Sequence, residues 1–351
     1  MTTTGETDDQ ERGLGEAIAR LGRRESLDAT AAEAAFVAVM EGRATPVQMA
    51  ALLVALRVRG ETAAEIAGGV RALRRAMVPV PVTPGTDVVD TCGTGGGALT
   101  TFNISTAAAL VAAAAGVRIA KHGNRSFSSR CGSADVLEAL GARIELTPDQ
   151  MGAVLDRCGI VFMFAPLLHP AMRHVGPVRR ELGMPTVMNV LGPLTNPAGA
   201  QRQVVGVADP RLLDLIAGGL CELGHTHALV VHGAPGLDEL SPIGTTEIRE
   251  VRAGTVRSFR LSPDELGWQG LSAAELAGGD PADNARIIRG LLDGRIGGTA
   301  RAATALNAGA AVYVAGLSDS ISDGVRMADA AIDSGAAALT LHNFCAATHA
   351  V

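Results

Sequence analysis

Three prolines in residues 77–85 (MVPVPVTPG) divide this chain into two parts with different folding patterns. No helix can run through this stretch, because proline lacks a backbone N–H and its ring clashes with the preceding turn. Before it, residues 14–77 carry helical patterns, with capping boxes that begin at Thr45 and Thr62. The sequence therefore predicts a small α-helical domain over residues 13–80.

The residues after the prolines predict an α/β unit. Residues 87–91 are a candidate buried strand, residues 104–115 have a helical pattern, and residues 117–120 are a second candidate strand. Such a βαβ unit implies parallel strands in a sheet covered by helices. Further strands are predicted at residues 161–164, 204–207 and 228–232, an antiparallel hairpin at 247–261, and helices from residue 281 onward. The predicted fold class is α/β, with a small all-α N-terminal domain and a larger α/β domain on a mainly parallel central sheet flanked by helices.

Charge and composition exclude some classes of function. The formal net charge of −6 argues against broad binding to nucleic acids or anionic membranes, although it permits a local pocket for a small anion. Five cysteines without a Cys-x-x-Cys pair indicate a reduced, cytoplasmic protein. Residues 1–12 are polar, contain no apolar signal core and are predicted to be disordered.

A glycine-rich loop, residues 92–97 (CGTGGG), joins the first predicted strand to its helix. Glycine lets the backbone approach a ligand, and the N-terminal end of a helix attracts anions. Polar residues 103–106 (NIST) are expected to cap that helix. The loop is neither a Walker A motif nor a G-x-G-x-x-G motif. It predicts either a phosphate site or a tight turn that needs glycine for backbone reasons.

A second polar loop, residues 121–129 (KHGNRSFSS), follows the next predicted strand. Loops after parallel strands leave the sheet at one carboxyl edge, where ligands bind in α/β proteins. The two loops are therefore expected to face each other across a crevice, with Lys121 and Arg125 as candidate phosphate partners. A solvated basic turn is the alternative for this loop taken by itself.

Two further features become candidate ligand-binding residues because a phosphate site is expected in that crevice. Asp238 and Glu239 follow the strand predicted at residues 228–232, and adjacent carboxylates suit Mg²⁺ that also binds phosphate oxygens. Arg179 carries a guanidinium, the natural partner of a ligand carboxylate. By itself, an Asp-Glu pair is more typical of a solvated loop than of a metal site, and Arg179 is equally typical of a surface residue on a helix.

Together these elements resemble the anthranilate phosphoribosyltransferase family over about residues 14–317. The strings KHGNR and NVLGPLTNP are highly specific for it. The matching segments are DTCGTGG (residues 90–96), NIST (103–106), KHGNRS (121–126), GSAD (132–135), VRRELG (178–183), NVLGPLTNP (189–197) and DEL (238–240).

The resemblance implies a homodimer that transfers the phosphoribosyl group of 5-phosphoribosyl diphosphate to anthranilate, releasing pyrophosphate, in tryptophan biosynthesis. It also implies that helices from about residue 173 to 200 join the small domain. The α/β domain that binds phosphoribosyl diphosphate then comprises residues 81–172 and 201–351.

Site residues follow from the same resemblance. Positions that match the phosphoribosyl diphosphate site are Gly93, Gly96, Gly97, Thr101, Asn103, Ile104, Ser105, Thr106, Lys121, His122, Gly123, Asn124, Arg125, Ser126, Phe127, Ser128, Ser129 and Ser133. Positions that match the anthranilate site are Gly93, His122, Asn124, His169 and Arg179. Positions that match the ligands of two Mg²⁺ ions are Ser105, Asp238 and Glu239. No catalytic acid or base is assigned, because a neutral aromatic amine needs positioning more than deprotonation.

The chain departs from the family pattern at two places. Gly97 stands where the family's glycine loop usually ends in aspartate, which removes a negative charge beside the diphosphate and its metal. We therefore expect an active protein with altered metal dependence. Residues 339–351 match nothing in the family pattern.

Two alternatives remain at this level. A pyrimidine nucleoside phosphorylase shares the architecture, but the segments at residues 121–125 and 178–183 would then have no role. A non-catalytic relative that binds nucleic acid would need a basic face and no intact metal ligands, which the charge of −6 and the presence of Ser105, Asp238 and Glu239 disfavour.

Overall fold

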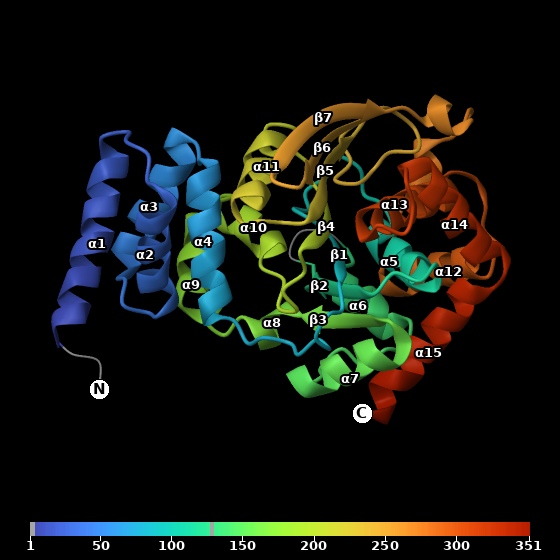
Figure 1. Cartoon of the computed structure of the whole chain (residues 1–351), viewed down its shortest axis with the longest axis horizontal. Coiled ribbons are helices and arrows are strands. Elements are labelled where there is room, and N and C mark those ends of the chain that lie inside the picture. Colours follow the sequence, from blue (N-terminus) through green and yellow to red (C-terminus); the bar gives the residue numbers. More distant parts are fainter. Residues whose placement is uncertain (1–3, 127–129) are drawn as a thin grey trace.

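Four helices form the first unit of the fold, as the sequence predicts. The computed structural model describes residues 4–126 and 130–351, and these helices lie together at one end of the molecule (Figure 1). They are α1 (Thr4–Gly22), α2 (Ala29–Met40), α3 (Pro46–Arg59) and α4 (Ala63–Ala76). The sequence predicts disorder over residues 1–12, whereas α1 begins at Thr4. Extending an existing helix by one residue costs far less than nucleating a new one, so a polar segment can continue it.

A buried carboxylate ties this helical unit together. Glu65 is fully buried and accepts hydrogen bonds from the backbone N–H groups of Leu27 at 2.9 Å and Thr62 at 2.8 Å. It also pairs with Arg59 at the end of α3. A buried charge is tolerated when it is paired and hydrogen-bonded in this way. Glu65 therefore holds the ends of three helices in one arrangement.

A seven-stranded sheet forms the centre of the second unit, in the order β3-β2-β1-β4-β5-β6-β7. Strands β1 to β5 pair in parallel, and β6 and β7 are antiparallel. The strands are β1 (Val89–Gly93), β2 (Ile119–Gly123), β3 (Ile160–Phe164), β4 (Arg202–Gly206), β5 (His227–Gly233), β6 (Thr246–Arg252) and β7 (Thr255–Leu261). The predicted mainly parallel sheet and the hairpin predicted at residues 247–261 are confirmed.

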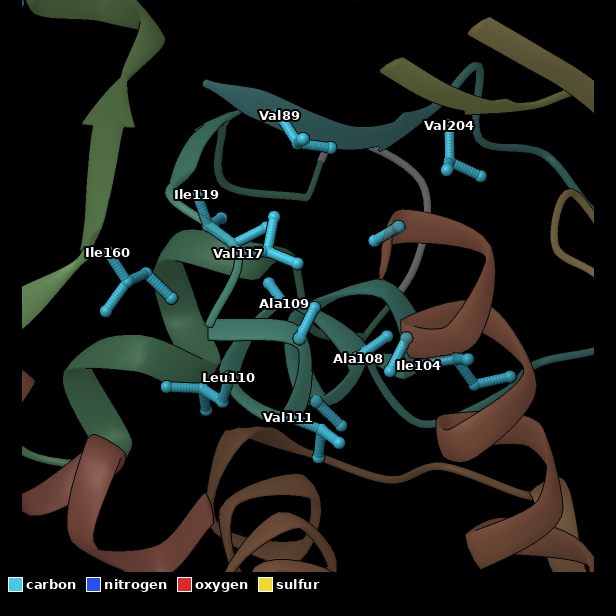
Figure 2. Close-up of a cluster of buried hydrophobic side chains, with 14 of the residues drawn as sticks. Val89, Ile104, Ala108, Ala109, Leu110, Val111, Val117, Ile119, Ile160 and Val204 are labelled. Carbon is cyan, nitrogen blue, oxygen red and sulfur yellow. The ribbon is translucent and has the colours of Figure 1, made fainter. Parts of the chain in front are cut away.

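One face of the sheet packs on two helices whose side chains are almost all buried. These are α5 (Ile104–Ala114) and α13 (Gly298–Ala315), whose many alanines allow them to lie close together. Figure 2 shows side chains of α5 in one buried cluster with Val89, Ile119, Ile160 and Val204, which come from four different strands. This contact explains why α5 is apolar on all sides, as expected of a helix buried all round.

The other face of the sheet shares a core with the helical unit. Successive strand residues point to opposite faces, so Val205 and Val230 join this second core while Val204 belongs to the first. Helix α11 (Leu212–Glu222) lies between the sheet and α4. A Cβ added at Gly219 would lie 2.8 Å from Ile66 Cγ2, so the small residue permits close packing of the two helices. The two units are thus joined by apolar contact as well as by the chain.

The chain returns to the helical unit once before it completes the sheet. Between β3 and β4 it forms α8 (Ala165–Leu168), α9 (Met172–Leu182), α10 (Met188–Leu191) and a short 3₁₀ turn, η1 (Gly192–Leu194). Helix α9 packs against α2 and α3, and α10 packs against α4. The chain then returns to the sheet through residues 192–198, and part of this stretch lines the functional site.

The remaining helices cover the α/β unit. They are α6 (Ser133–Ala139), α7 (Pro148–Cys158), α12 (Pro281–Leu292), α14 (Ile321–Asp333) and α15 (Ala336–Ala350). Residues 339–351, which match no family motif, lie in α15 and at its end. Phe344 is buried there, and Thr348 Oγ1 accepts a hydrogen bond from Arg143 N–H at 3.0 Å, so the segment is part of the core. Within the described ranges, no helix combines the length and apolar character that crossing a bilayer requires.

Candidate functional site

A pocket of about 340 Å³ lies at the carboxyl edge of the parallel strands. Residues from the ends of β1 and β2, the start of α5, and the loops after β2 and β5 line it. The lining residues are Cys92, Gly93, Gly95, Asn103, Ser105, Lys121, His122, Gly123, Asn124, Ser133, Ala165, Gly192, Pro193, Asp238 and Glu239. The glycine loop and the second polar loop thus face each other, as the sequence predicts.

The loop after β5 brings its carboxylates into the glycine loop. It passes directly over the end of β4, where a Cβ added at Gly206 would lie only 1.6 Å from the backbone oxygen of Asp238. A Cβ added at Gly93 or Gly97 would lie 3.0 Å from a carboxylate oxygen of Asp238. The carboxylate of Asp238 is therefore held between the two ends of the glycine loop, and glycine at position 206 makes this placement possible.

Glu239 and Lys121 both interact with Ser105 at the start of α5. Lys121 Nζ donates hydrogen bonds to the backbone oxygen of Thr91 at 2.5 Å and to Ser105 Oγ at 3.2 Å. Burial and the neighbouring Asp238 raise the pKa of Glu239 to about 8, although Lys121 and the backbone N–H of Ser105 lower it. Burial also raises the pKa of Asp238.

These groups fit a hard divalent cation that is bound by protein oxygens and by the oxygens of a substrate phosphate. Two adjacent carboxylates that repel one another would be stabilised by such an ion, and the hydroxyl of Ser105 is an oxygen donor beside them. In the described part of the chain, no group of three or more His, Cys, Asp or Glu side chains could hold a metal by itself. Mg²⁺ fits best, because it usually retains water and takes substrate oxygens along with one or two carboxylates.

Two histidines meet beside the pocket. The Nε2 atoms of His122 and His169 are 3.1 Å apart, so one ring donates a hydrogen bond and the other accepts it. Burial lowers the pKa of His122 to about 3 and that of His169 to about 4. Both rings are therefore neutral at pH 7 and add no positive charge to the site.

The start of α6 closes the pocket beside the second polar loop. Ser133 Oγ donates a hydrogen bond to the backbone oxygen of Asn124 at 3.3 Å, and Asn124 Oδ1 accepts one from Arg125 N–H at 2.7 Å. The backbone of the loop is thereby fixed, with Ser133 and Asn124 both on the pocket surface.

Arg125 and Arg179 do not line the pocket in this structure. Arg125 instead pairs with Asp135 at 2.9 Å and Glu138 at 2.5 Å, and these partners raise its pKa. Arg179 lies on α9, where it donates a hydrogen bond to Asn189 at 3.4 Å. The positive charge in the pocket wall therefore comes from Lys121 rather than from these arginines.

The structure thus brings together some of the predicted residues and not others. Those on the pocket surface are Gly93, Asn103, Ser105, Lys121, His122, Gly123, Asn124, Ser133, Asp238 and Glu239, and His169 contacts one of them. Near the pocket but not in its lining are Gly96, Gly97, Thr101, Ile104, Thr106, Arg125 and Ser126, and Arg179 is on α9. Phe127, Ser128 and Ser129 lie outside the described residues.

One expectation about the glycine loop is wrong. The side chain of Asn103 does not cap α5. It donates to the backbone oxygen of Cys131 at 3.2 Å and accepts from Asn284 at 2.9 Å, so both ends of this half-buried amide have a partner.

Sequence reasoning missed five lining residues: Cys92, Gly95, Ala165, Gly192 and Pro193. Gly192 and Pro193 lie inside the NVLGPLTNP string, so that motif was the available signal. Ala165 has no such signal, since only the return of the chain from β3 places it there.

Models of known families match both units. The helical bundle domain of a glycosyl transferase family matches residues 15–77, and the α/β domain of that family matches residues 85–338. Together they cover most of the chain.

Individual proteins are similar over nearly the whole length. The anthranilate phosphoribosyltransferase of Rubrobacter xylanophilus is 52% identical, with 94% of this chain and 96% of that protein covered. That of Methanosphaerula palustris is 51% identical over 93% of this chain and 96% of its own length.

Solved structures give the same result. The crystal structure of anthranilate phosphoribosyltransferase from Thermus thermophilus superposes with a TM-score of 0.89 and 45% identity, covering 95% of this chain and 99% of that one. The Saccharomyces cerevisiae enzyme in complex with PRPP and Mg superposes with a TM-score of 0.87 and 27% identity, covering 97% and 99%. This chain belongs to the anthranilate phosphoribosyltransferase family.

Proposed function

We propose that this protein transfers the phosphoribosyl group of 5-phosphoribosyl diphosphate to anthranilate, giving N-(5-phosphoribosyl)anthranilate and pyrophosphate, in tryptophan biosynthesis. The observation that carries the proposal is the meeting of the glycine loop, Lys121 and the Asp238–Glu239 pair in one pocket. An anion that needs a metal fits this combination, and the relatives named above act on such a substrate.

The chemistry needs charge stabilisation and alignment. As the bond between ribose carbon 1 and the diphosphate oxygen breaks, the sugar becomes positive and the leaving group negative. The ammonium of Lys121, fixed by Thr91 and Ser105, would stabilise the leaving group. Mg²⁺ held by Ser105, Asp238 and Glu239 would add Lewis-acid charge there when bound.

The amine of anthranilate attacks the same ribose carbon, and its nitrogen then loses a proton. Because that amine is neutral at pH 7, orientation contributes more than deprotonation before attack. We assign Asn124, His122 and His169 to the wall against which the ring lies. The neutral state of both histidines suits an aromatic ligand better than two buried cations would.

We propose two Mg²⁺ ions, shared between the substrate phosphates and the Asp238–Glu239 pair. The variant Asp238→Asn/Glu239→Gln keeps the size of both side chains and removes their charge. We expect turnover, followed as loss of anthranilate fluorescence with phosphoribosyl diphosphate, to fall by roughly a hundredfold or more. The wild-type reaction should stop when Mg²⁺ is omitted, and Mn²⁺ binding followed by electron paramagnetic resonance should saturate at two ions per chain.

Parallel assays separate the alternative functions. Phosphorolysis of thymidine without anthranilate consumption would contradict the proposal in favour of a nucleoside phosphorylase. A salt-dependent shift of DNA with no turnover would favour the nucleic-acid-binding relative. Near-normal rates in the double variant would contradict the metal assignment alone.

We propose that Arg179 binds the anthranilate carboxylate when the substrate enters between α9 and the pocket. It is half-buried, burial lowers its pKa, and its hydrogen bond to Asn189 is long. Arg179→Ala is expected to raise the KM for anthranilate by about tenfold, the loss expected for one charged hydrogen bond, with a smaller change in the KM for phosphoribosyl diphosphate. The exposed neighbour gives a matched control, Arg180→Ala, which should change neither constant. An unchanged KM for anthranilate in Arg179→Ala would remove Arg179 from the site.

We propose that Gly97 alters the metal dependence of the reaction. A side chain at this position would begin 3.0 Å from Asp238 Oδ1, so an aspartate would add a second negative charge beside a metal ligand. Gly97→Asp is expected to shift the Mg²⁺ concentration that gives the maximal rate. Gly97→Asn adds the same bulk without the charge and should leave that optimum in place. Identical Mg²⁺ profiles for Gly97→Asp and the wild type would contradict the proposal.

We propose that the protein is a cytoplasmic homodimer. Pro46, Val47 and Ala50 of α3 form a mainly apolar groove with Val178, Glu181 and Leu182 of α9, and Val47 is 78% exposed. The free thiols of Cys92, Cys158, Cys221 and Cys345 suit a reducing compartment.

The dimer can be tested by sedimentation equilibrium. The wild type is expected to show twice the mass of one chain, and Val47→Glu to shift it toward the monomer, because a charge would be buried at the contact. Leu339→Glu, at an exposed position on α15, is the matched control and should stay dimeric. A monomeric wild type, or no effect of Val47→Glu, would contradict this surface.

A further inference from the structure

We propose that Asp90, which does not line the pocket, is a positioning residue that locks two walls of the pocket together. The inference rests on the transferase function proposed above. Asp90 lies on β1 and is fully buried, two residues before Cys92, where the pocket surface begins.

Asp90 holds the wall that carries Lys121 and His122. Its Oδ1 atom accepts a hydrogen bond from the backbone N–H of His122 at 3.1 Å. This bond matters for register, because β1 and β2 share only the pairing of Val89 with Ile119 in the ladder. Near the pocket, the carboxylate of Asp90 therefore takes the place of a second ladder contact between the two strands.

Asp90 also holds the opposite wall, which arrives from the helical unit. Its Oδ2 atom accepts a hydrogen bond from Asn196 Nδ2 at 2.8 Å, and the same amide nitrogen donates to the backbone oxygen of Ala120 at 2.9 Å. Asn196 Oδ1 in turn accepts from the backbone N–H of Ala198 at 2.9 Å. Asn196 is fully buried, so these bonds fix the end of the segment that carries Gly192 and Pro193.

A glutamine on β4 completes the network. Gln203 Nε2 donates to the backbone oxygen of Pro193 at 3.1 Å and lies 3.5 Å from Asp90 Oδ2. Gln203 Oε1 is 3.0 Å from His225 Nε2, so this side chain is itself held in place. Three strands and the 192–198 segment thus meet at one carboxylate.

The chemistry of the partners explains why a carboxylate is needed. The backbone N–H of His122, the amide of Asn196 and the amide of Gln203 are all donors, so an acceptor with lone pairs on both oxygens satisfies them. Asparagine at position 90 has the same shape, but its NH₂ group would face the NH₂ group of Asn196. A buried donor left facing a donor is costly, so one of the two walls must move.

The negative charge of Asp90 also balances the positive charge of Lys121, although the Nζ atom of Lys121 bonds to other residues. The Nζ atom of Lys121 stays bonded to Thr91 and Ser105, at the edge where the diphosphate would lie. The nearby charge of Asp90 favours the ammonium form of that lysine, which burial disfavours. The carboxylate is thus placed to keep the lysine charged while leaving it at the pocket surface.

The test compares Asp90→Asn with the wild type in the Mg²⁺-dependent assay. We expect kcat/KM for phosphoribosyl diphosphate to fall by about tenfold or more, the usual loss when a group that orients a ligand-binding residue is removed. A folded Asp90→Asn with kcat/KM within twofold of the wild type would overturn the proposal.

A second buried carboxylate supplies the matched control. Glu250 accepts hydrogen bonds from His227 at 2.9 Å and Tyr313 at 2.6 Å, at the end of β5 away from the pocket. Glu250→Gln should lower the Tm while leaving kcat and both KM values near those of the wild type. Equal losses of activity in Glu250→Gln and Asp90→Asn would show a general effect of stability and contradict positioning.

Two further outcomes keep the test decisive. If Asp90→Asn does not fold, Gln203→Met removes the hydrogen bonds that this side chain makes with Pro193, Asp90 and His225, and it should raise the KM for phosphoribosyl diphosphate several-fold. An unchanged KM would overturn the proposal. If the wild type does not consume anthranilate, the proposed function fails, whereas an active wild type with an unaffected Asp90→Asn leaves the function standing and removes only this inference.

Discussion

The pocket depends on the parallel pairing of β1, β4 and β5, which release their loops at the same edge of the sheet. Gly93 pairs with Gly206 at the ends of β1 and β4, and Gly206 pairs with Val231, beyond which β5 continues to Gly233. The missing side chain at Gly206 then lets the loop after β5 cross directly over β4. Without that close approach, the carboxylates of Asp238 and Glu239 would lie above the sheet edge instead of inside the glycine loop.

Charge is distributed around the pocket in a way that leaves room for a cation and an anion together. Lys121 contributes an ammonium group fixed by Ser105, while Asp238 and Glu239 contribute two carboxylates to the same pocket. Burial raises the pKa of Glu239, and the neighbouring carboxylate of Asp238 raises it further. The neutral pair formed by His122 and His169 adds surface for an aromatic ring and leaves this balance unchanged.

Sequence reasoning recovered the local parts of the fold and left out contacts between distant segments. The capping boxes, the βαβ unit and the hairpin follow from short-range patterns, and the strand order placed both polar loops at one edge. The Asp90 network joins β1 to residues more than a hundred positions away, so no periodicity reveals it. Likewise, nothing in the KHGNR string shows that Arg125 turns toward Asp135 and Glu138, because those partners come from the following helix.

The glycine contact between α4 and α11 has a consequence for how the protein can be divided. Because Ile66 of α4 and Val230 of β5 belong to the same core, a chain shortened to begin near residue 85 would expose the face of the sheet that this core covers. Such a fragment would carry all the proposed metal ligands and most of the pocket, yet it would tend to aggregate rather than bind substrate. The helical unit therefore covers an apolar face of the sheet and keeps the protein soluble, so the α/β unit needs the helical unit in the same chain.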